Sequence, residues 1–271
     1  ELFYVTTAQL RTYTSLAGLY LLQEKITEAL AWAERAEILY ADLQYVANHM
    51  IYGLYLKVYA DSYYGRALNL TFLAAARAVA QRNPAAGASQ FALADAVYEA
   101  LGYAAGKATT QALRAWAALK AGQPDQADVA AARAVELAIA ARLPDLVWRV
   151  QALRGEALLA AERAADAEAA FRSADAAVDA VSGALSSDRA KRRFGVGKDD
   201  LTYRLAQFDV GRGDIGRLFA DLERSRARAF VDMLSDRPVA LGRGGQEAQR
   251  IRAIDAEVRQ RRLVVTSASS P

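Results

Sequence analysis

Apolar and small residues recur along this chain three or four positions apart, and short polar segments interrupt them. In residues 6–22, Leu16, Ala17 and Tyr20 fall on one helical face. In residues 25–41 the small residues on one face are Ala29, Ala33 and Ala36. The polar residues between the two segments suit a tight turn. The pattern therefore predicts a first pair of antiparallel helices.

A longer period of forty residues relates three later blocks of the chain. The positions that recur are Leu73, Ala75, Gly87, Phe91 and Ala94, then Leu113, Ala115, Ala127, Ala131 and Ala134, then Leu153, Gly155, Ala167, Phe171 and Ala174. Such a period is typical of stacked helical hairpins, because each hairpin leaves an apolar face that only its neighbour buries. We therefore predict an all-α fold, an α-α superhelix built as a solenoid of stacked hairpins.

Two stretches depart from this spacing. The first hairpin and the next matching one lie 58 positions apart instead of forty, so residues 43–62 should hold an additional helix or a degenerate repeat. After Val181 the pattern lapses, and it resumes at residues 201–210 and 215–235. The expected organisation is a repeat array over 1–183, a C-terminal hairpin over 184–238, and a flexible joint with a charged helix over 239–271.

Composition excludes several kinds of chemistry. The sequence has no cysteine, which rules out disulfides, thiolate metal ligands and a cysteine nucleophile. Its one histidine, His49, argues against a histidine metal cluster. We expect no metal, no cofactor and no catalytic constellation in this chain. No apolar run reaches the roughly eighteen residues of a membrane span, so we expect no membrane partner and a cytoplasmic location.

The helical pattern resembles the tetratricopeptide repeat (TPR). That family places Leu-Gly or Leu-Ala in the middle of the first helix, then alanine, an aromatic residue or alanine four on, and alanine three further. Gly155 with Ala167, Phe171 and Ala174 matches this pattern. The spacing of forty is longer than the usual repeat of the family, which implies longer helices.

Residues 221–234 resemble the last TPR helix before the protease-like module of CHAT proteins, which are caspase-related members of the separase clan. The matching run extends from Glu223 to Phe230, and a charged segment follows at 246–262. The resemblance implies that the chain is the sensor or regulatory arm of a CHAT-type protease whose catalytic module lies elsewhere in the intact protein. No catalytic residue carries over. A free-standing TPR adaptor without an enzymatic module is the alternative.

A nucleic-acid-binding helical repeat is a less favoured alternative. Residues 184–271 carry 18 basic against 12 acidic side chains, and Arg224 and Arg228 belong to this basic part. These two arginines lie four apart beside Asp221 and Glu223, as on a surface helix with local ion pairs. We therefore do not expect nucleic acid as a partner and predict instead that Arg224 and Arg228 dock the protease module.

First helices of a TPR array usually line its concave surface, so residues beside their packing face are the candidate contacts to a protein or peptide in that groove. They are Arg11, Thr14, Trp116, Lys120, Arg149, Glu156, Leu159, Tyr203 and Gln207, together with Tyr52 and Tyr59 from an aromatic stripe. Each has a structural alternative: Trp116 packs between repeats, the charged side chains are merely solvated, and the tyrosines pack between helices.

Overall fold

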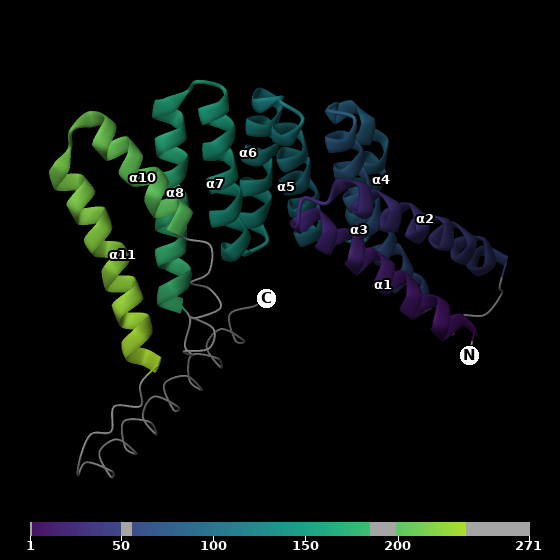
Figure 1. The fold of residues 1–271 in the computed structure, drawn as a ribbon. Helices are drawn as coiled ribbons and strands as arrows, with labels where there is room; N and C mark the ends of the chain where they lie inside the picture. Colours follow the sequence, from purple (N-terminus) through teal and green to yellow (C-terminus); the bar gives the residue numbers. More distant parts are fainter. Residues whose placement is uncertain (1, 50–55, 185–198, 237–271) are drawn as a thin grey trace, which may run out of the picture. The chain divides into compact units, whose positions relative to one another are not determined.

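The structure is a computed structural model that describes residues 2–49, 56–184 and 199–236 (Figure 1). Side chains are described over residues 8–42, 63–181 and 200–226. The helices are α1 (Leu2–Leu22), α2 (Ile26–His49), α3 (Leu56–Ala80), α4 (Ala88–Ala100), α5 (Ala104–Lys120), α6 (Pro124–Ala140), α7 (Pro144–Ala160), α8 (Ala164–Ala184), α10 (Asp199–Arg212) and α11 (Ile215–Asp236). A 3-10 turn, η2 (Pro84–Gly87), precedes α4. These ranges contain no strand.

The helices pack in chain order as hairpins. Each helix from α1 to α8 contacts its successor, and α10 packs on α8. Contacts between hairpins also join the first helices directly, α1 to α3, α3 to α5 and α5 to α7 (Figure 1). The prediction of an all-α fold of stacked helical hairpins is confirmed.

The chain forms two compact units, Glu1–Ser225 and Arg226–Pro271. The first unit contains α1 to α10 and the start of α11, and all contacts discussed below lie within it. The second unit begins inside α11, whose helix is described to Asp236.

The forty-residue period is the length of one regular hairpin with its two loops. Helices α5, α6 and α7 have 17 residues each, and three residues separate each from the next. The small residues of the repeat are buried in all three blocks: Ala75, Gly87 and Ala94, then Ala115, Ala127 and Ala134, then Gly155, Ala167 and Ala174. Small side chains at these positions let the two helices of a hairpin approach closely.

The prediction of an additional helix or degenerate repeat over 43–62 is wrong. Helix α2 runs on to His49 and α3 begins at Leu56, so they are 24 and 25 residues long where the regular helices have 17. These two helices thus account for fifteen of the eighteen extra positions, and the remaining three fall in 50–55, outside the described residues. The register changes because one pair of packed helices is longer.

Seven helices end in the same hydrogen-bonded closure. At the end of α3, for example, Asn83 N–H donates to the carbonyl of Ala78 at 2.9 Å and Arg82 N–H donates to Val79 at 3.1 Å. This pattern is the Schellman motif, which needs one residue at positive φ. That residue is glycine at three ends, Gly102, Gly122 and Gly213, and a larger residue at the others, Glu24, Arg82, Arg142 and Glu162.

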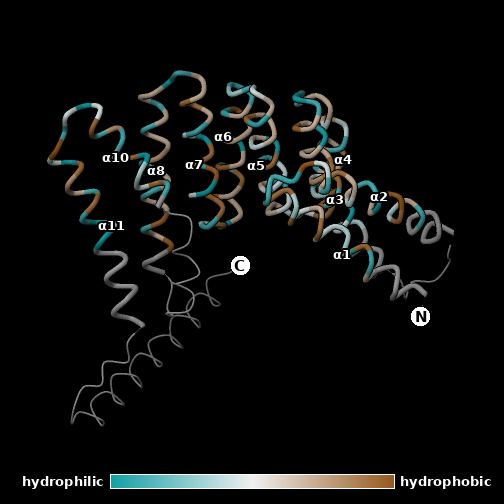
Figure 2. Tube along the Cα trace, in the orientation of Figure 1, coloured by the Kyte–Doolittle hydropathy of each residue, from teal (hydrophilic) through white to brown (hydrophobic). Residues whose placement is uncertain are grey.

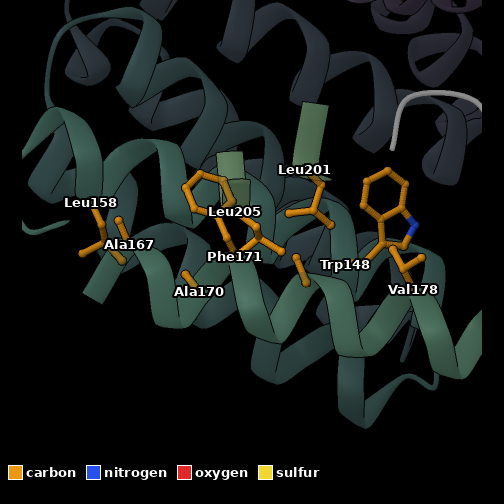
Figure 3. Close-up of a cluster of buried hydrophobic side chains, with 9 residues drawn as sticks. Trp148, Leu158, Ala167, Ala170, Phe171, Val178, Leu201 and Leu205 are labelled. Carbon is orange, nitrogen blue, oxygen red and sulfur yellow. The ribbon is translucent and has the colours of Figure 1, made fainter. Parts of the chain in front are cut away.

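A buried apolar cluster joins α7, α8 and α10 (Figure 3). Phe171 is 1% exposed and lies over Gly155, where an added Cβ would come within 2.7 Å of its ring. From α10, Leu201 and Leu205 enter the same cluster. Hydrophobic and hydrophilic positions are interspersed along the coloured parts of the helices (Figure 2), as expected for helices that bury one side and expose the other.

Arginine side chains link successive hairpins. The pairs are Arg66 Nη2 to Glu37 Oε1 at 2.5 Å, Arg114 Nη2 to Asp95 Oδ2 at 3.3 Å, and Arg154 Nε to Asp128 Oδ1 at 2.6 Å. In each pair the acid lies on a second helix and the arginine on the first helix of the following hairpin. All three pairs are at least partly shielded from solvent, which limits screening by salt.

Candidate partner-binding pocket

An apolar pocket of ≈270 Å³ opens between three successive first helices. Helix α1 lines it with Gly18, Leu21 and Leu22, α3 with Phe72, and α5 with Leu113 and Trp116, while Glu24 of the α1–α2 turn completes the lining. Three hairpins therefore contribute to one site. Concave apolar sites with few polar groups are the usual form of a ligand pocket.

Gly18 allows Phe72 to lie beneath α1. A Cβ at this position would come within 2.9 Å of two atoms of the Phe72 ring. Real Cβ contacts are not that short, so an alanine here would push the ring aside or α1 away from α3. The pocket floor thus depends on a residue without a side chain.

Leu22 forms an apolar wall that is open to solvent. It is 85% exposed, although it belongs to the last turn of α1 and lines the pocket. The neighbouring Leu19 is also exposed. Scattered exposed leucines are ordinary, but Leu22 is exposed where it also lines an apolar pocket.

An ion pair beside the pocket joins the first hairpin to the third. Lys120 Nζ lies 2.5 Å from Glu24 Oε1, and both side chains remain partly exposed. Glu24 has a φ of 56°, a conformation that L-residues other than glycine adopt at a cost. The pair connects the α1–α2 turn to α5 beside the pocket.

Two of the predicted partner contacts meet at this pocket. Trp116 lines it, and Lys120 reaches Glu24 beside it. Trp116 also packs against the buried cluster around Phe91 and Ala117, so it takes part in packing between repeats as well. The groove-facing and the packing interpretation of Trp116 are thus compatible.

Neither of the two predicted contacts on α1, Arg11 and Thr14, lines the pocket. Thr14 is 4% exposed, and its hydroxyl lies 3.2 Å from the hydroxyl of Tyr40 on α2. A partner cannot reach it, so the expectation that Thr14 faces a ligand is wrong. Its polar group is instead satisfied inside the first hairpin. Arg11 is exposed on the same helix but does not line the pocket.

The predicted contacts on α7 are engaged within the chain. Glu156 accepts two hydrogen bonds from Arg204 of α10, at 2.8 and 2.9 Å. Arg149 pairs with Asp145 at 3.1 Å and stacks on the ring of Trp148, while remaining exposed. Leu159 packs beside the α7–α8 cluster. Glu156 thus links α7 to α10, whereas the partners of Arg149 lie on α7 itself.

The predicted contacts on α10 do not line the pocket. Tyr203 and Gln207 are exposed on α10, and Gln207 accepts a hydrogen bond from Arg204 at 3.3 Å. Tyr52 lies outside the described residues, and the side chains of Tyr59 and Arg228 lie outside those described. Of the predicted contacts in the described part of the chain, Trp116 lines the α1–α3–α5 pocket and Lys120 pairs with Glu24 beside it.

Arg224, expected to dock a further module, is paired inside the first unit. Its Nη1 lies 3.5 Å from Asp175 on α8 and 3.2 Å from Asp221 on α11. The guanidinium is half exposed. It therefore attaches α11 to α8, and any docking role would have to compete with these two carboxylates.

A buried carboxylate lies beside this seam. Asp209 of α10 is 0% exposed and accepts a hydrogen bond from Arg172 Nη2 at 2.8 Å, while another nitrogen of Arg172 pairs with Asp221. Burial raises the pKa of Asp209 against the attraction of Arg172, and the neighbouring Asp221 adds to the rise. Three helices thus meet through charged groups.

The terminal hairpin exposes several large apolar side chains. They are Tyr203 and Val210 on α10, and Ile215, Phe219 and Leu222 on α11. Phe219 is 64% exposed.

No protein-family model matches the chain, and no curated protein is found to be similar to it. None of the described helices is both long and apolar enough to span a bilayer. Within the described ranges, no three His, Asp or Glu side chains gather to hold a metal ion.

Sequence reasoning missed most of the pocket lining. Gly18 and Leu22 of α1 meet Phe72 of α3 because these two hairpins stack directly, whereas an additional helix or degenerate repeat was expected between them. One signal was present: the run from Leu19 to Leu22 is apolar on every side of the last turn of α1, which is more than one buried face requires.

Proposed function

We propose that the chain is a scaffold that binds a protein or peptide through the pocket between α1, α3 and α5. The observation that carries the proposal is this apolar pocket on the first helices, with the exposed Leu22 and the large ring of Trp116 in its lining. Aromatic residues in such positions contribute much of the energy of interfaces. Repeat arrays generally act through extended binding surfaces of this kind.

The test is a displayed peptide library selected on the immobilised chain. Leu22→Ala should weaken the selected peptides by about fivefold or more, the size of an interface residue that matters. Because Leu22 is 85% exposed, its truncation should leave the thermal unfolding midpoint unchanged. Trp116→Ala should weaken binding as well, with some loss of stability because the ring also packs inward.

The matched control is Ile139→Ala. Ile139 is 61% exposed on α6 and does not line the pocket, so its truncation should change neither binding nor stability. If the selected peptides bind the Leu22 and Ile139 variants equally well, the pocket is not the binding site.

We further propose, on the resemblance of residues 221–234 to CHAT proteins, that the scaffold is the sensor or regulatory arm of a CHAT-type protease. The exposed apolar side chains of the terminal hairpin support this proposal, since a following module would cover them. The chemistry would belong to that module. A cytoplasmic location is part of the proposal and fits the absence of cysteine.

The intact gene product provides the test. Adding a selected peptide should change its proteolytic rate, and Phe219→Asp should abolish that response without changing peptide affinity. Absence of any protease module would leave a free-standing adaptor.

Nucleic-acid binding is disfavoured because Arg224 already pairs with two carboxylates. Retention of the chain on a polyanion column that weakens steeply as the salt concentration rises would support nucleic-acid binding instead.

A further inference from the structure

The pocket between α1, α3 and α5 offers its occupant apolar contacts and few main-chain partners. Apart from Glu24, its lining residues lie within helices, whose main-chain groups bond to one another. At the end of α1, Lys25 N–H donates to Tyr20 at 2.9 Å and Glu24 N–H donates to Leu21 at 3.0 Å. These bonds close the helix end that faces the pocket.

An extended peptide would therefore bind poorly here. Its main-chain groups would lose hydrogen bonds to water and find none in return on the apolar walls. An α-helix satisfies its own main chain and presents only side chains, as in complexes where an amphipathic helix lies in an apolar groove. The volume of ≈270 Å³ is below the range of about 300–1,000 Å³ typical of drug-sized ligands, and suits one bulky side chain.

Charged groups near the pocket would meet the polar side of such a helix. Glu24 is the charged residue that lines the pocket, and the charged side chains of α1 and α5 are all basic: Arg11 on α1, and Lys107, Arg114 and Lys120 on α5. The third wall, α3, carries Asp61 as well as Lys57, Arg66 and Arg77. Lys107 and Arg114 are paired with Glu99 and Asp95 of α4. Lys120 is held at the pocket by Glu24, whose side chain is 60% exposed. An exposed pair of this kind is weak and exchanges partners readily.

We propose that the occupant is an amphipathic helix of a partner protein, which inserts one bulky apolar side chain between Leu22 and Trp116. A carboxylate three or four residues along the same helix takes Lys120 in exchange for Glu24. This inference rests on the proposed function and adds to it the conformation and charge of the ligand. Glu24 thereby acts as an internal competitor that the correct partner displaces.

The experiment compares two displayed libraries on the immobilised chain. One randomises the face of a stable helical scaffold, and the other consists of linear peptides with a fixed central proline, which cannot form a helix. We expect binders from the helical library, with Leu, Phe or Met as the anchor and Asp or Glu three or four positions away. Binders confined to the proline library, or helical binders without a preferred acid, would overturn the inference.

Charge variants then test the exchange. With a selected helix as the probe, Lys120→Gln should weaken binding about two- to fivefold, and Glu24→Gln should strengthen it by a similar factor. Both effects should vanish when the acid of the helix is replaced by glutamine. Lys107→Gln, on the same helix α5 but paired with Glu99, is the matched control and should have no effect.

The two proposals fail differently. If Leu22→Ala weakens the selected helices while Glu24→Gln and Lys120→Gln leave their affinity unchanged, the pocket is the site and the charge exchange is wrong. If Leu22→Ala has no effect on any selected binder, the proposed function is wrong as well.

Discussion

Phe171 and Gly155 form a matched pair whose energetics can be predicted from their contact. Phe171 is 1% exposed, and an added Cβ at Gly155 would lie 2.7 Å from its ring. Forty positions earlier the equivalent residues are Ala115 and Ala131. The second repeat therefore packs two alanines where the third repeat packs a glycine against a phenylalanine. The double variant Gly155→Ala/Phe171→Ala gives the third repeat the residues of the second at this contact, and a double-mutant cycle measures how strongly the two positions are coupled.

The expected magnitudes follow from each change. Phe171→Ala removes a buried ring and should cost about 3–5 kcal/mol. Gly155→Ala forces the ring aside, at about 1–3 kcal/mol, but gains about 1 kcal/mol of helix propensity, so it should cost about 0–2 kcal/mol alone. With Phe171 already truncated, the new methyl enters the cavity, and Gly155→Ala should then stabilise the protein by about 1 kcal/mol.

The assay is urea denaturation followed by far-UV circular dichroism for the two single variants and the double variant. The coupling should be about 1–3 kcal/mol in favour of the double variant. If the double variant lost the sum of the single costs, Gly155 and Phe171 would not form a matched pair. A loss below about 1 kcal/mol for Phe171→Ala alone would contradict the burial of its ring.

Two further predictions concern backbone strain and pH. Arg142 closes α6 at a φ of 55°, so Arg142→Gly should raise the free energy of unfolding by about 0.5–1 kcal/mol. The control Arg133→Gly, in the interior of α6, should lower it by about 1 kcal/mol. Equal losses for the two variants would show that the backbone at Arg142 is not strained. Because burial raises the pKa of Asp209 above its ordinary 3.8, protonation favours the folded state. That contribution is fully present below the unfolded pKa and is lost as the pH rises through the folded one. The stability of the protein relative to Asp209→Asn should therefore fall as the pH rises above 3.8, as measured by urea denaturation at several pH values.

The repeat could be predicted because its information is local. Burial of small residues at positions such as Ala127 and Ala167 follows from the spacing of forty, and the helix starts at Pro124 and Pro144 follow from the restricted φ of proline. Each of these features depends on residues a few positions away. The fold class and most hairpins were therefore within reach of the sequence.

Partners of polar side chains were not predictable, because they depend on distant segments. Glu156 pairs with Arg204, 48 positions later and across a stretch without the repeat. Thr14 is buried by Tyr40, and that contact depends on how α1 packs against a helix longer than the repeat suggests. The pocket itself combines Leu22 with Trp116, 94 positions apart, and needs the stacking of three hairpins.

The arginine links between hairpins give the array a direction. At the first three seams the earlier hairpin supplies the acid and the later one the base, as in Glu37 with Arg66. At each of these seams one acid of the earlier hairpin faces one arginine of the later hairpin. A duplicated hairpin inserted at such a seam would meet the right charge on both flanks, whereas two arrays joined by like ends would oppose equal charges. Lengthening by tandem duplication is thus electrostatically neutral, and back-to-back association is not.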